Sequence, residues 1–195
     1  MSVRRYWRLV TSVIDAPAYF YIGSVLHADT CELAISEGEA VTGEYPADPF
    51  TVEAHFSAAS GLQAPSLIGN GMSLVALHRD VVKLFSKELD LGEHEVLPFT
   101  LVNHKGRAHS KEYVFLNPVG THDVASPLSK FMRFDDGEIY GCEHWVLSAK
   151  KLADVPDILR PAEVANEYLV SDRLVALVEQ HALTNFELES VDVVT

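Results

Sequence analysis

Histidine and cysteine side chains are the groups in this sequence best suited to nucleophilic or metal chemistry. Nine histidines occur, and two of them stand in short polar clusters: His122 precedes Asp123, and His144 follows Cys142 by two residues. A cysteine beside a histidine is the pairing that a thiolate nucleophile needs, and both side chains are zinc ligands. On a strand, Cys142 and His144 would share one face. Cys142, His144 and His122 are therefore the candidate site of a small metal- or cysteine-dependent hydrolase.

The spacing of these residues gives that hydrolase site little support. Among the histidines and the cysteine from His94 to His144, only Cys142 and His144 are spaced as a ligand pair. A lone cysteine more often packs as a small apolar side chain. The segment Gly69-Asn70-Gly71 lacks the remaining glycine and the lysine–serine pair of phosphate-binding loops, and is typical of a tight turn. We predict no catalytic residue, no metal ligand and no cofactor.

The charge of the chain bears on its partners. Lysine and arginine number 15 among 195 residues and aspartate and glutamate 28, which gives a net charge of −13. Such a field repels nucleic acid and anionic lipid and attracts a basic protein surface. The alternative is that the acidity serves only solubility.

Two acidic clusters would meet the cations of such a partner: Asp135-Asp136 with Glu138 and Glu143, and Glu37 with Glu39 and Glu44. The alternative is that Asp135-Asp136-Gly137 is a turn and that the other carboxylates form a solvated face.

The N-terminal segment and the cysteine content predict a cytoplasmic protein. Arg8, Thr11 and Asp15 interrupt any apolar run of a signal peptide, and no stretch approaches the roughly 20 apolar residues of a membrane helix. The two cysteines, Cys31 and Cys142, lie far apart and do not form a secreted disulfide framework.

Strand patterns dominate the first two-thirds of the chain. A glycine- and proline-rich segment, 36–71, predicts long surface loops around a single strand at 50–56. The other expected strands are 5–10, 19–22, 73–77, 95–102, 112–116, 137–140, 144–147, 168–170 and 186–191.

Two amphipathic helices are expected, one over 78–89 and one beginning after the N-cap Ser171. Gly92 and Asn185 accept the left-handed conformation that ends helices. A shift of 93 residues superimposes the apolar stripes of the two helices. This match indicates either a repeat or convergent amphipathic patterning. The fold class predicted is α+β: one domain, 1–195, with a mostly antiparallel sheet, two amphipathic helices in strand–helix–strand units, and a β-rich part with long loops at 1–64.

A series of short motifs in the segment 65–195, about two-thirds of the chain, matches a known pattern. The motifs are Leu74-Val75-Ala76-Leu77, Val81, Leu84 and Phe85, 96–99, Tyr113–Pro118, Trp145-Val146-Leu147-Ser148, Lys151-Leu152, Ile158-Leu159-Arg160, 168–174 and 183–188. In these residues the chain resembles a family of bacterial immunity proteins of polymorphic toxin systems, a myxobacterial-type domain formerly of unknown function. The family usually has glycine where Asn185 stands.

The resemblance implies a non-enzymatic inhibitor that binds a cognate toxin in the producing cell. The matching motifs are structural, so they identify no binding residues and no oligomeric state. The other two hypotheses are the hydrolase and an adaptor without a toxin partner. Genomic context separates them, because a toxin gene immediately upstream favours immunity.

Overall fold

Two β-sheets and three helices form most of the computed structural model, which describes residues 4–12, 18–26, 31–46, 50–55 and 62–195. The larger sheet has the strand order β2-β3-β6-β8-β5-β4, with β7 paired to β6, and the smaller has the order β12-β13-β1-β14. The strands of the larger sheet are β2 (Tyr21–Leu26), β3 (Phe50–His55), β4 (Leu67–Ile68), β5 (Val75–His78), β6 (His94–Val102), β7 (Ala108–Ser110) and β8 (Tyr113–Pro118). Those of the smaller sheet are β1 (Tyr6–Val10), β12 (Ile158–Leu159), β13 (Tyr168–Ser171) and β14 (Glu187–Ser190).

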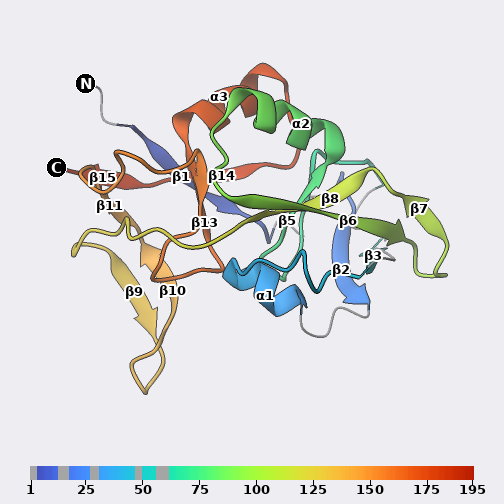
Figure 1. Ribbon diagram of the computed structural model, residues 1–195, viewed down its shortest axis with the longest axis horizontal. Coiled ribbons are helices and arrows are strands. Elements are labelled where there is room, and N and C mark those ends of the chain that lie inside the picture. The colour runs from blue at the N-terminus through green and yellow to red at the C-terminus, as the bar shows by residue number, and fades with distance from the viewer. Residues whose placement is uncertain (1–3, 13–17, 27–30, 47–49, 56–61) are drawn as a thin grey trace.

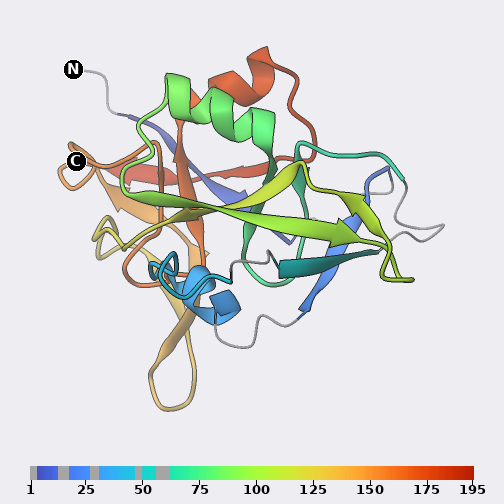
Figure 2. The same cartoon turned by 45° about the vertical axis from the view of Figure 1, so that its right-hand side comes forward.

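The remaining elements are a hairpin, a parallel strand pair and the helices. The hairpin of β9 (Lys130–Arg133) and β10 (Ile139–His144) extends away from the sheets (Figures 1 and 2). The strands β11 (Val146–Ser148) and β15 (Asp192–Val194) pair in parallel. The helices are α1 (Cys31–Glu37), α2 (Arg79–Glu88) and α3 (Asp172–Gln180). Apart from β11–β15 and β3–β6, the paired strands of the described chain are antiparallel, so the predicted α+β class with mostly antiparallel sheet is confirmed.

The core of the molecule follows the alternation of strand side chains. On β8, Val114 and Leu116 join a cluster that also contains side chains of α2, α3 and the smaller sheet. Tyr113 and Phe115 face the other side, where they pack with side chains of β3, β6 and α1. All six residues of β8 are buried, because this strand lies at the centre of the larger sheet with side chains packed on both faces.

The predicted helices α2 and α3 lie side by side over the shared core (Figure 1). Phe85 is buried beneath α2, as the apolar stripe predicts. In α3 the Ser171 hydroxyl accepts a hydrogen bond from the Leu174 N–H at 3.4 Å, so the predicted N-cap is confirmed. Asn185 has a φ of 64°, which confirms its left-handed conformation, but it lies beyond the C-cap His181 and so does not end α3. Gly92 has a φ of 59° but lies beyond the C-cap Leu89, so it shapes the turn after α2.

The prediction of two helices is wrong by one within the described chain. The third helix, α1, reaches into the segment predicted as loops. It has seven residues, of which only Cys31 and Ile35 are buried, and two turns are too few to produce a recognisable helical period. Within the described residues, no helix is long and apolar enough to cross a membrane.

The predicted strand–helix–strand units are not confirmed as self-contained units. The strands before and after α2, β5 and β6, do not pair with each other, because β8 lies between them. Likewise β13 and β14 flank β1, which comes from the start of the chain. Each helix therefore connects two strands across a third that the local sequence pattern does not include.

A buried arginine joins α1 to both sheets. Arg160 follows β12, is fully buried, and pairs with no carboxylate of the described residues. Its guanidinium lies 4.3 Å from the centroid of the Tyr168 ring. It donates to six acceptors: the carbonyls of Ile35 (2.6 Å), Ser36 (2.6 Å), Ala165 (2.7 Å) and Pro118 (3.0 Å), the Tyr168 hydroxyl (2.6 Å) and the Asn117 amide oxygen (3.3 Å). The arginine thereby fixes the C-terminal end of α1 against the segment that precedes β13.

The contact between Arg160 and the end of α1 requires glycine at position 38. A Cβ at Gly38 would lie 2.6 Å from Cδ of Arg160, and the φ of Gly38, 79°, is in the left-handed region. Gly120 is a matched control, because its φ is 77° and a Cβ at that position would have nothing within 4 Å.

We predict that Gly120→Ala lowers the free energy of unfolding by about 1–2 kcal/mol, the cost of a left-handed non-glycine residue. Gly38→Ala should cost about 1–3 kcal/mol more, because its methyl group also displaces Arg160. Urea denaturation of the two variants measures the difference. Equal losses would show that Arg160 accommodates the methyl group and does not fix α1 rigidly.

Candidate partner-binding surface

The predicted hydrolase residues Cys142, His144 and His122 do not form one site in the structure. Cys142 is fully buried, and its thiol donates to the Lys130 carbonyl at 3.4 Å. His144 is exposed, with Nε2 3.2 Å from a carboxylate oxygen of Asp192. A bulge between Cys142 and His144 breaks the strand alternation, so the expectation that they share a face is wrong.

His122 lies apart from Cys142 and His144, beside the segment that contains Arg160 and Pro161. Its backbone bridges to Pro161, its N–H donates to the Arg160 carbonyl at 2.8 Å, and burial lowers the pKa of its imidazole. The neighbouring Asp123 accepts from Lys151 at 2.6 Å. Within the described ranges no three histidine, cysteine, aspartate or glutamate side chains are placed to hold a metal ion.

The two acidic clusters meet instead at one groove of about 550 Å³. Its walls are the end of α1, the β9–β10 hairpin and the segment 162–166. Glu37 and Glu39 line it from the first wall, Glu138 from the second and Glu163 from the third. No lysine or arginine is among the described residues that line it. We call this the acidic groove.

Three acidic residues singled out from the sequence are exposed on the hairpin outside this lining: Asp135, Asp136 and Glu143. Glu44 is likewise exposed but does not line the groove. The prediction that Asp135-Asp136-Gly137 forms a turn is confirmed, since the Gly137 N–H donates to the Phe134 carbonyl at 2.9 Å. These carboxylates strengthen the negative field around the groove without shaping it.

Exposed apolar side chains accompany the acidic ones. Phe134 is 56% exposed, Tyr140 is 47% exposed, and their ring centroids lie 4.5 Å apart across the hairpin. Leu33 of α1, 64% exposed, lines the same groove. An aromatic pair and a leucine in contact with water, rimmed by carboxylates, are typical of a protein-binding surface. No local sequence pattern marks these three residues as exposed.

Hydrogen bonds fix the wall that carries Glu39. The Glu95 carboxylate accepts from the Val41 and Thr42 N–H groups at 3.0 and 2.7 Å. The Asn117 amide donates to the Glu39 carbonyl at 2.8 Å and to Glu95 at 3.0 Å. Burial raises the pKa of Glu95, but these hydrogen bonds outweigh it and hold the pKa below its usual value. The loop beyond α1 is therefore anchored to the larger sheet.

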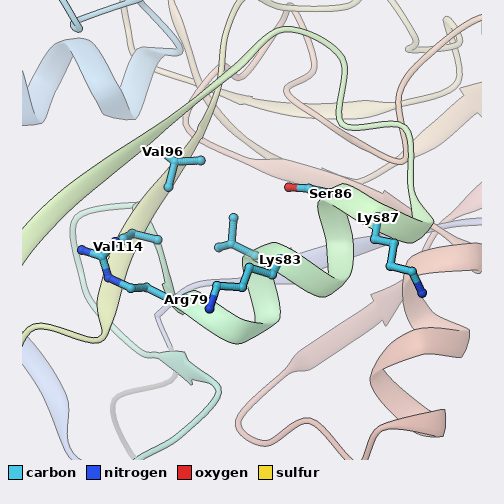
Figure 3. A pocket seen from close by; sticks show the side chains of 7 residues that line it. Arg79, Lys83, Ser86, Lys87, Val96 and Val114 are labelled. Carbon is cyan, nitrogen blue, oxygen red and sulfur yellow. The ribbon is translucent and has the colours of Figure 1, made fainter.

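A second groove, of about 530 Å³, has the opposite charge. It lies between α2 and the larger sheet, with Arg79, Lys83 and Lys87 on the helix and Val96 and Val114 on the strands opposite (Figure 3). The cations already have partners. Lys83 binds Asp80 at 2.9 Å, Lys87 binds Glu88 at 2.7 Å, and Arg79 donates to a backbone carbonyl at 3.0 Å. We call this the α2 groove.

We predict that Cys142 of the folded protein reacts with iodoacetamide at pH 8 at least about a hundredfold more slowly than in urea. Burial raises the pKa of its thiol to about 11, so almost none of it is the reactive thiolate at that pH. Peptide mass mapping separates Cys142 from Cys31, the other cysteine. Labelling of Cys142 at the urea rate would mean that the thiolate is formed and accessible, and would restore the hydrolase hypothesis.

A comparison with protein-family models and with curated proteins finds no match to this chain. The resemblance to immunity proteins therefore stays a prediction.

Proposed function

We propose that this protein is a non-enzymatic immunity protein that acts in the cytoplasm, where it binds a cognate bacterial toxin and neutralises it by protein–protein contact. The observation that carries the proposal is the acidic groove. There, two acidic clusters about a hundred residues apart in sequence meet around the exposed pair Phe134 and Tyr140.

The composition of this surface supports protein binding. Interfaces combine a desolvated centre, often aromatic, with a polar rim. Phe134, Tyr140 and Leu33 would supply the centre, and Glu37, Glu39 and Glu138 the rim. The net charge of −13 speeds encounter with a basic surface. A toxin whose active site attracts an anionic substrate presents such a surface.

The hydrolase alternative has weaker support. A cysteine nucleophile requires a thiolate beside a base. The Cys142 thiol instead packs in an apolar cluster with Trp145 and Leu147, and burial raises its pKa. The nearest histidine in sequence, His144, is turned to solvent and pairs with Asp192. Neither side chain has the surroundings of an activated nucleophile or of its base.

The first test is co-expression of the chain with the protein encoded beside it. We expect rescue of growth when that neighbour is toxic, and co-purification of the two proteins. A toxic neighbour that is neither neutralised nor bound would remove the proposal.

Charge reversal then locates the interface. We predict that Glu138→Lys weakens the complex at least about tenfold, because like charges placed together at an interface cost a few kcal/mol. Glu112→Lys makes the same change in net charge at an exposed carboxylate outside the acidic groove, and should alter the Kd less than about twofold. Titration calorimetry at physiological salt measures both. Equal weakening would mean that only the overall charge matters and that the groove is not the binding site.

A further inference from the structure

One carboxylate oxygen of the acidic groove has no hydrogen-bond donor within the described part of the chain. Oε2 of Glu163 is buried, and no donor among the described residues reaches it. An oxygen of this kind has lost its water without gaining a protein partner, which is unfavourable for a group that normally accepts several hydrogen bonds. Glu163 as a residue is only partly buried and lines the groove, so a rotation of its carboxylate would present this oxygen to a donor that enters from outside.

The hairpin wall offers the same entering group a second contact. The faces of aromatic rings attract cations, and Phe134 and Tyr140 are both exposed and close together. No lysine or arginine among the described lining residues already occupies this place. The hairpin's own Arg133 is engaged elsewhere, because it donates to the Gly137 carbonyl at 2.7 Å.

We propose that the acidic groove receives an arginine side chain of the partner protein, with its guanidinium stacked on Phe134 and Tyr140 and donating to the carboxylate of Glu163. This inference rests on the proposed function for the identity of the partner as a toxin. Arginine fits better than lysine, because its planar guanidinium can stack on a ring and donate to a carboxylate in the same pose. Arg160 shows this chemistry within the chain, where it stacks on Tyr168 and donates to its hydroxyl.

The occupant follows from charge complementarity. Four carboxylates line the groove, so an uncharged or acidic side chain would leave them unpaired. The α2 groove has the opposite preference, and its cations are already paired. A basic partner is therefore directed to the acidic groove and not to the α2 groove.

The test uses two fluorescent peptides of equal length and charge, one alternating glycine with arginine and the other glycine with lysine. Fluorescence anisotropy with the full chain should give a Kd at least about fivefold lower for the arginine peptide. Phe134→Ala and Glu163→Gln should each reduce this preference to less than about twofold. Glu112→Gln removes the same charge outside the groove and should leave the preference intact. Circular dichroism shows whether each variant is folded.

Equal binding of the two peptides, or a preference that survives both groove variants, would overturn the arginine site. Co-purification with the toxin is measured separately, so the two proposals fail separately. A toxin complex whose Kd ignores Phe134→Ala and Glu163→Gln would overturn the arginine site and leave the immunity function standing. An arginine preference without any toxin complex would support the site and remove the toxin as its partner.

Discussion

The shape of the acidic groove depends on the hydrogen bonds that the buried guanidinium of Arg160 donates. A charge taken out of water without a counter-ion is costly unless every donor is satisfied. Here six acceptors and an aromatic face replace the water, and two of the acceptors, the carbonyls of Ile35 and Ser36, lie at the negative C-terminal end of α1. Because Ala165 accepts from the same guanidinium, the end of α1 and the segment 162–166 cannot separate without exposing it. Two walls of the groove are thus held by one side chain.

The third wall is held differently. The β9–β10 hairpin extends from the body of the molecule, and its base is tied to the core by the buried Cys142, whose N–H donates to the Glu167 carboxylate at 3.3 Å. Its tip carries Phe134 and Asp135-Asp136 into solvent. The projecting hairpin and the two walls opposite it leave a groove between them that has room for a partner side chain. The positive charges of α2 lie in a separate groove, so this distribution of charge would orient a basic protein as it approaches.

Local patterns in the sequence predicted the elements that satisfy themselves locally. The apolar stripe around Phe85, the Ser171 cap and the left-handed Asn185 each follow from a few neighbouring residues, and each is confirmed. The helix α1 escaped prediction because seven residues with two buried side chains show no period. Arg160 and Phe134 escaped because their roles depend on contacts between distant segments. The acidic clusters were visible in the sequence, but a charge run does not reveal which other run it will face.

Hydrogen exchange of the chain alone and in complex with its co-purified partner tests the central claim most directly. If the acidic groove is the binding site, binding should slow the exchange of amides at the end of α1, in the hairpin tip 133–140 and in the segment 162–166, while α2 exchanges as in the free protein. Protection confined to α2, or absent from all three walls of the groove, would contradict the account.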